Sequence, residues 1–292
     1  MPGNDRVARD GAARDGAVMT APLVLGAVAY DPKVVTIWDG FRRWFAQQDL
    51  PFDYLLYSNY ERQVEDLVAG RTDVAWNSPL AWVRARRLDG RAEAVAMRDT
   101  DRDLTSVVVV RDDSGITSVA ELSGRTVATG PVDSPQASLL PLALLAEVDV
   151  DVRRFQTGVG LHGDHIGGER DAARALTAGD VDAACMIDAN HLLFTTEGTL
   201  PAGGTRVIAQ TPPYDHCNMT VVGSDSPLLE PFVSLLLGMD FADRSVRPLL
   251  ELEGLRRWLP GRVFGYQQLE AAVDRFGFYD DTGEVTADGY RP

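Results

Sequence analysis

Lysine is almost absent from this chain: Lys33 is the single lysine among 28 basic residues, and all the others are arginine. A genome that favours arginine codons explains this bias without reference to function. Alternatively, the one ammonium has a role, because the pKa of a lysine shifts readily on burial whereas that of an arginine does not. Acidic residues number 43, and the net charge of −15 argues against a nucleic-acid partner, which requires a basic surface.

Cysteines and long apolar runs are also scarce. Two cysteines, Cys185 and Cys217, are too few for a disulfide framework. Cys185 lies in an apolar run typical of a protein core, whereas Cys217 lies in a polar loop. No stretch approaches the ~18 apolar residues of a membrane span, so we expect none.

The N-terminal residues lack the apolar segment of a secretion signal. Residues 1–18 repeat Arg-Asp-Gly-Ala, and no cysteine follows them for lipid attachment. We expect residues 1–22 to form a disordered extension, of which 1–18 are dispensable, unless translation begins at Met19. The same features predict a cytoplasmic protein.

From Leu23 onward, apolar runs alternate with amphipathic stretches. Strands are expected over 23–29, 52–57, 74–76, 105–111, 126–128, 152–156, 181–187, 206–209 and 218–223. Helices are expected over 34–47 and 60–69, after Ser78-Pro79, from Ser134-Pro135 to about 147, and over 170–178, 226–239, 244–253 and 266–276. Short β-α-β repeats of this kind predict a mostly parallel sheet covered by helices.

Three phrases of the sequence carry a family resemblance. Residues 66–80 read DLVAGRTDVAWNSPL, residues 114–128 read SGITSVAELSGRTVA, and residues 178–184 read AGDVDAA. They resemble segments of the type II periplasmic-binding-protein superfamily, in its phosphate/phosphite/phosphonate substrate-binding-protein-like family. The resemblance extends from residue 23 to about residue 278.

The resemblance implies an α/β fold of two lobes with a ligand cleft between them. The first lobe would be discontinuous, residues 23–103 plus 215–292, and the second would comprise residues 104–214, with a two-segment hinge. Ligands of this fold lie at the carboxyl ends of strands, where helix N-termini present free amide groups. A small anionic molecule is therefore the expected ligand, although the missing secretion signal argues against a transporter partner.

Polar side chains that follow the predicted strands are the candidate ligand contacts. These are Tyr30, Asp31, Lys33, Asn77 and Ser78 in the first lobe, Ser134, Gln136, Asp188 and His191 in the second, and Tyr214 at the hinge. Ser78 could cap its helix, hold an anion, or do both. Pro135 removes an N–H donor and Asp133 adds negative charge, which weakens the case for a doubly charged phosphonate.

All four histidines lie in the second lobe or at its return crossing, in three loops that each contain an aspartate: His162, His165, His191 and His216. Recognition of a polar or anionic ligand is the favoured interpretation. Acid–base catalysis by His162, His165 and His216 is the second, since imidazole titrates near neutral pH. A metal site formed by the same three with Cys217 is the third, but the His-x-x-His spacing is short for zinc. Unrelated surface histidines are the fourth.

Two functions therefore compete. The first is a binding protein for a small anionic metabolite. The second is a cytoplasmic enzyme of lyase or transferase type on the same fold, as in menaquinone- and thiamine-pathway relatives, with Lys33 available for imine chemistry. No phosphate-loop, dinucleotide or nucleophile-elbow motif is present, so we expect neither a cofactor nor a metal.

Overall fold

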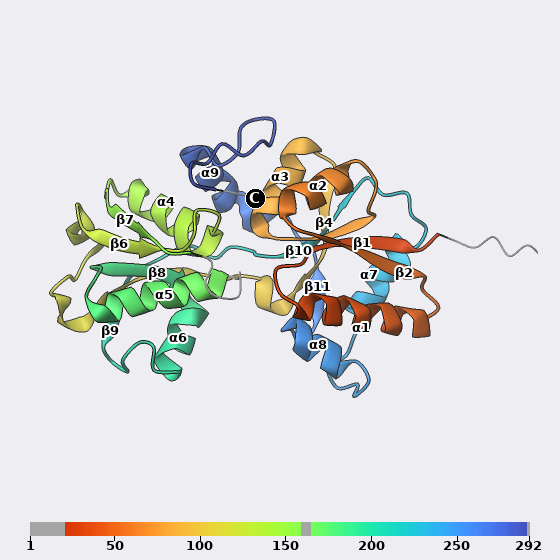
Figure 1. Cartoon of the computed structure of the whole chain (residues 1–292), viewed down its shortest axis with the longest axis horizontal. Coiled ribbons are helices and arrows are strands. Elements are labelled where there is room, and N and C mark those ends of the chain that lie inside the picture. The colour runs from red at the N-terminus through yellow and green to blue at the C-terminus, as the bar shows by residue number, and fades with distance from the viewer. Residues whose placement is uncertain (1–20, 159–164, 291–292) are drawn as a thin grey trace, which may run out of the picture.

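The chain folds into two lobes, each built on one mixed β-sheet covered by helices (Figure 1). The computed structural model describes residues 21–158 and 165–290. His162 and nearly all of the expected N-terminal extension, residues 1–20, lie outside these ranges. Within the described ranges, no helix combines the length and the apolar character that a membrane crossing requires.

The sheet of the first lobe has six strands in the order β11-β4-β10-β3-β1-β2. Their bounds are β1 (Leu23–Val28), β2 (Phe52–Tyr57), β3 (Val74–Asn77), β4 (Ala92–Arg98), β10 (Asn218–Val222) and β11 (Trp258–Pro260). Strand β1 pairs in parallel with β2 and β3. Strand β10 lies between β3 and β4 and runs antiparallel to both.

The sheet of the second lobe has five strands in the order β7-β6-β8-β5-β9. Their bounds are β5 (Ser106–Arg111), β6 (Thr126–Thr129), β7 (Arg153–Gln156), β8 (Ala183–Ile187) and β9 (Thr205–Gln210). Strand β6 is parallel to β7 and β8, but β5 is antiparallel to β8 and β9. The expectation of a mostly parallel sheet is therefore wrong. Strands β5 and β10 enter their sheets directly from the other lobe, without the helical crossover that makes neighbours parallel.

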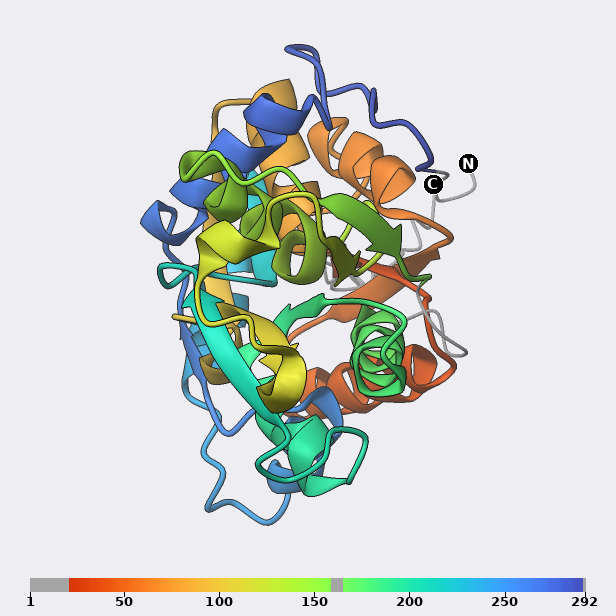
Figure 2. The same cartoon turned by 90° about the vertical axis from the view of Figure 1, so that its left-hand side faces the viewer.

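Helices cover both faces of each sheet. In the first lobe, α1 (Lys33–Gln47), α7 (Leu229–Leu237) and α8 (Arg247–Glu253) cover one face, and α2 (Tyr60–Val68), α3 (Pro79–Leu88) and α9 (Gln267–Phe276) cover the other. The second lobe has α4 (Leu140–Glu147), α5 (His165–Ala178) and α6 (Asp188–Thr196). Alternate residues of β5 face α5 and α4, which lie on opposite sides of its sheet (Figure 2).

Short helical turns complete the structure. A π-helical turn, Pro135–Leu139, leads into α4. The 3-10 turns are Asp99–Asp101, Asp112–Ser114, Val119–Leu122 and Phe264–Tyr266.

One apolar cluster joins the two lobes. Around α9, Tyr266 and Phe278 pack with Trp82 of α3 and with Leu139 and Leu140 at the start of α4. Figure 1 shows α9 above the junction of the lobes. The lobes are therefore in contact through α9 as well as through the chain that connects them.

Two chain segments, 99–105 and 211–217, cross between the lobes side by side. Leu104 and Tyr214 exchange two backbone hydrogen bonds of 2.8 Å. The buried carboxylate of Asp215 accepts a hydrogen bond from the backbone N–H of Asp103 at 3.2 Å and pairs with Arg262 at 2.5 Å. The crossings thus form a short antiparallel hinge held by an ion pair whose carboxylate is buried.

Candidate functional site

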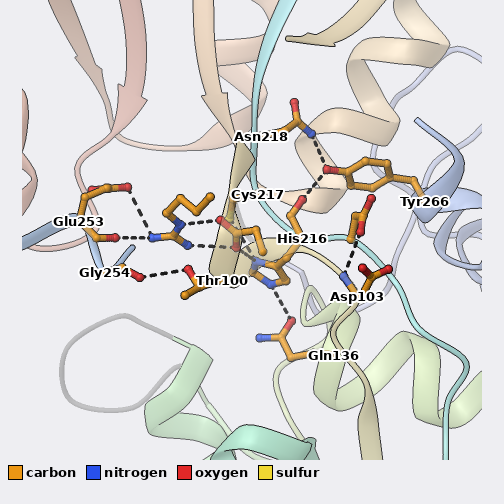
Figure 3. Close-up of polar contacts among 12 residues, drawn as sticks. Thr100, Asp103, Gln136, His216, Cys217, Asn218, Glu253, Gly254 and Tyr266 are labelled. Atoms are coloured by element: carbon orange, nitrogen blue, oxygen red, sulfur yellow. Dashed lines mark hydrogen bonds and ion pairs between the residues drawn. The ribbon is translucent and has the colours of Figure 1, made fainter. Parts of the chain in front are cut away.

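Side chains from both lobes meet around His216, which lies on the second crossing (Figure 3). Its Nδ1 atom lies 3.2 Å from Cys217 Sγ and 3.4 Å from Asp101 Oδ1, and its Nε2 atom lies 3.4 Å from Gln136 Oε1. Its backbone is also fixed, because its N–H donates to Asp101 O and its carbonyl accepts from Tyr266 Oη, both at 2.8 Å. The imidazole is therefore held in one orientation at the junction of the lobes.

Gln136 is the contribution of the second lobe to this contact. It is buried, and its Nε2 atom donates to Glu169 Oε1 at 3.3 Å. Glu169 is itself fully buried, and its Oε2 atom accepts from Ile187 N at 2.9 Å and from Asn190 Nδ2 at 2.7 Å. Because the amide nitrogen of Gln136 faces Glu169, its oxygen faces His216, which must donate from Nε2.

The contacts of His216 favour a proton on both ring nitrogens. Its Nε2 atom donates to an amide oxygen, and its Nδ1 atom faces the carboxylate of Asp101. Burial alone would lower the pKa of His216, but Cys217 and Asp101 outweigh that effect and raise the pKa to about 10. The side chain is thus an imidazolium cation at neutral pH.

An ion-pair network continues from Asp101 into the first lobe. Arg98 binds both Asp101 oxygens, with Nε at 2.5 Å and Nη2 at 3.1 Å. Against the raising effect of burial, Arg98 lowers the pKa of Asp101 to about 2. Arg98 Nη1 also donates to the backbone oxygen of Glu253 at 2.8 Å. Burial raises the pKa of Glu253 to about 7, although Arg98 opposes the shift.

Asp101, His216 and Cys217 place their ligand atoms within 4.8 Å of one another, close enough for a metal ion. Their chemistry does not fit one. Arg98 already occupies both oxygens of Asp101. A metal ion would have to displace this guanidinium, so the cluster fits an ion-pair network better than a metal centre.

The predicted contacts Tyr30, Asp31 and Lys33 occupy the turn between β1 and α1. Asp31 Oδ1 accepts a hydrogen bond from Lys33 N at 2.7 Å, and the Lys33 ammonium lies 5.8 Å from the centre of the Tyr30 ring. Burial, with help from nearby Glu253 and Cys217, raises the pKa of Tyr30 to about 12. The turn therefore adjoins the network around His216.

The predicted serines begin helices in the two lobes. Ser78 is the N-cap of α3, and its Oγ atom accepts from Ala81 N at 3.2 Å. Ser134 caps the π-helical turn in the same way, accepting from Ala137 N at 3.1 Å. Both hydroxyls therefore satisfy backbone donors of their own helices.

Asn77 and Tyr214, also predicted as ligand contacts, belong to buried networks. The Asn77 amide accepts from Gln63 Nε2 at 2.7 Å and donates to Thr220 Oγ1 at 2.8 Å. The Tyr214 hydroxyl lies 2.7 Å from Ser106 Oγ. Each polar group thus has a protein partner away from solvent.

The other described histidines lie elsewhere in the second lobe. His165 begins α5, with Nε2 3.2 Å from Asp133 Oδ2. The loop expected at Asp188 and His191 is instead helix α6, where Asp188 is exposed and His191 Nε2 lies 3.0 Å from Thr205 Oγ1. An acidic residue in the first turn favours such a helix. The structure does not bring His191 to the lobe junction.

Several members of the network were not selected from the sequence: Arg98, Asp101, Glu169 and Glu253. Arg98 directly precedes the first crossing and Asp101 lies in it, positions that could have identified them. Glu169 shares the buried face of α5 with alanines and a leucine. A charged residue on an otherwise apolar helix face indicates a buried polar contact, and this pattern could have identified Glu169. Tyr60 begins α2, and burial together with Cys217 raises its pKa well above the ordinary value.

Residues 27–262 match the family model described as "ABC transporter, phosphonate, periplasmic substrate-binding protein". The probable ABC transporter phosphite binding protein PhnD1 of Prochlorococcus marinus (strain MIT 9301) is 23% identical over 240 residues, 77% of this chain and 78% of PhnD1. The solved structure of PhnD1 from this organism with methylphosphonate has a TM-score of 0.65 at 18% identity, covering 87% of this chain and 98% of that one. XAC2383 from Xanthomonas citri, bound to ATP, has a TM-score of 0.66 at 19% identity, covering 88% and 98%. The chain therefore belongs to the family of ABC transporter phosphonate periplasmic substrate-binding proteins, which are small-molecule binders.

Proposed function

We propose that this protein binds a small oxyanion between its lobes, with His216 as the cationic contact at their junction. The observation that carries the proposal is the position of His216 between Gln136 Oε1 and Asp101 Oδ1, two acceptors on opposite sides of its ring that favour a proton on each nitrogen. An oxyanion that replaced Gln136 as the acceptor at Nε2 would gain a charge-assisted hydrogen bond, which is stronger than one between neutral groups. Methylphosphonate in PhnD1 and ATP in XAC2383 are likewise anions that carry phosphorus–oxygen groups.

A singly charged oxyanion suits this site better than a doubly charged one. The charge of Arg98 is already balanced by Asp101, so His216 is the remaining cation of the network, and Glu253, whose pKa is about 7, offsets part of its charge. On the second lobe, Ser138 Oγ donates to Gly130 O at 2.8 Å and Pro135 has no N–H. The start of this helix in the second lobe therefore offers an anion few hydrogen-bond donors, and those that remain are uncharged.

The alternative is an enzyme on the same fold, of lyase or transferase type, with acid–base chemistry at the histidines. General acid–base catalysis is most efficient when the pKa of the group lies near the working pH. The pKa of His216, about 10, keeps its proton in place at pH 7. This favours recognition over proton transfer.

Titration calorimetry with methylsulfonate, phosphite and methylphosphonate tests the proposal. At least one should bind, and His216→Ala should weaken binding by roughly 1.5–3 kcal/mol, the usual contribution of a hydrogen bond to a charged group. His191→Ala is the matched control and should leave the affinity unchanged, because His191 lies in α6 and bonds Thr205 of β9.

A product assay on the same samples separates binding from turnover. If His216→Ala abolished turnover while binding stayed within about tenfold, the catalytic alternative would be correct. Absence of binding by all three anions, or an unchanged affinity in His216→Ala, would contradict the proposed site.

The compartment is a further part of the proposal. The matched family is described as periplasmic, whereas we expected a cytoplasmic protein and considered a transporter partner doubtful. We keep the cytoplasmic placement as a proposal. Fractionation of the native host tests it, since release of the protein by osmotic shock would contradict it.

A further inference from the structure

A cavity of about 250 Å³ lies between the second lobe and the C-terminal segment, apart from His216. Strands β6 and β7 and helix α4 form one wall, and residues 276–288 after α9 form the other. The residues that line it do not include any member of the network around His216. Figure 1 shows α9, from which this segment continues, close to α4.

The cavity has an apolar floor and a polar rim. Leu139 and Phe278 are buried members of the cluster that joins the lobes. The Phe276 ring lies beside them, with the guanidinium of Arg154 5.5 Å from its centre. Arg154 and Gln156 lie on the same face of β7, because alternate residues of a strand share a face.

The polar groups of the rim have unused hydrogen-bonding capacity. Within residues 21–158 and 165–290, the side chains of Arg154, Gln156 and Asp288 take part in no hydrogen bond or ion pair. Among these residues, the polar interaction of the Arg154 guanidinium is its cation–π contact with Phe276. The guanidinium of Arg154 and the side-chain amide of Gln156 are therefore available to bind an occupant of the cavity.

We propose that this cavity is a second ligand site, for a small monocarboxylic acid with an aromatic or branched apolar body. The planar guanidinium of Arg154 matches a carboxylate bidentately, and Gln156 adds an amide donor. Phe276 and Phe278 offer ring surface to the apolar body. An apolar cavity of about 150 Å³ holds benzene, so the larger volume here suits a one-ring acid. Asp288 at the rim disfavours a second negative charge.

An occupant of this site touches the second lobe and the C-terminal segment at once. It therefore stabilises the packing of α9 against α4, which Arg275 supports by donating to Ala146 O at 2.9 Å. The site is thus placed to influence the contact between the lobes without involving the residues around His216.

Benzoate is the probe, titrated into the full-length protein and followed by calorimetry. We expect saturable binding that Arg154→Ala weakens about tenfold or more. Arg153→Ala is the matched control and should bind as the wild type does, since adjacent strand residues face opposite sides and Arg153 does not line the cavity. Ala287→Phe fills the cavity and should abolish binding.

His216→Ala should leave benzoate binding unchanged, which distinguishes this site from the proposed oxyanion site. The proposal is overturned if the wild type shows no saturable benzoate binding or if Arg154→Ala binds benzoate equally well. It is also overturned if Arg153→Ala or His216→Ala loses benzoate binding while Arg154→Ala retains it.

Discussion

Glu253 is the buried carboxyl whose charge changes near neutral pH. Burial raises its pKa from the ordinary 4.5 to about 7, so the folded state binds its proton more tightly than the unfolded state. The contribution of Glu253 to stability is therefore full below pH 4.5 and falls as the pH rises from 4.5 through 7. Above pH 7, Glu253→Gln should be more stable than the wild type by about 3 kcal/mol.

Urea unfolding at several pH values between 4.5 and 8 measures this difference. Glu251→Gln, an exposed change in the same helix, should follow the wild type at every pH. Parallel pH profiles for Glu253→Gln and the wild type would show that Glu253 does not titrate in this range.

Asn77 illustrates why part of the site was beyond sequence reasoning. Its position at the end of a strand suggested a cleft contact, but its amide bonds Thr220, which is 143 residues away in the chain. That partner exists only because β10 inserts beside β3. By contrast, His216 and Gln136 were predictable, because one lies on an expected crossing and the other at an expected helix start.

At the level of elements, regular patterns predicted structure well and irregular ones did not. The expected strand at 52–57 matches β2, and the expected helix at 60–69 nearly matches α2. Strand β4 was not assigned, since its sequence, AEAVAMR, contains one β-branched residue and two charges. Helix α6 was also missed: Leu192 and Leu193 are exposed and only Phe194 is buried, so it lacks an apolar stripe.

The hinge depends on the buried carboxylate of Asp215, which pairs with Arg262 and accepts from the other crossing. Asp215→Ala removes the buried partner of Arg262, which keeps its pair with Asp103, and should cost roughly 1.5–3 kcal/mol of unfolding free energy, the usual contribution of a hydrogen bond to a charged group. Asp171→Ala is the control, because its pair with Arg174 is exposed and contributes less than about 1 kcal/mol. Equal losses in urea unfolding would show that the pair does not hold the hinge.

For the molecule as a whole, the cluster around α9 predicts a single cooperative unfolding transition, because it contains core residues of both lobes. Phe278→Ala removes a fully buried ring from it and should cost about 3–5 kcal/mol. The lobes should then unfold in two calorimetric transitions. Phe232→Ala, in the separate core of the first lobe, should lower the transition temperature without splitting the peak. One peak in both variants would contradict this role of the cluster.

Strand β10 occupies the middle of the first sheet but is synthesised after the entire second lobe. On a ribosome, all five strands of the second sheet emerge before β10 and β11, the two neighbours of β4. Domains fold as units during synthesis, usually the N-terminal one first. Here the order should be reversed, with residues 106–210 compact while β4 awaits a partner. Nascent chains arrested once residue 217 has emerged should therefore resist protease in the second lobe and be cut near β4. This interval of synthesis should then be the one most dependent on chaperones.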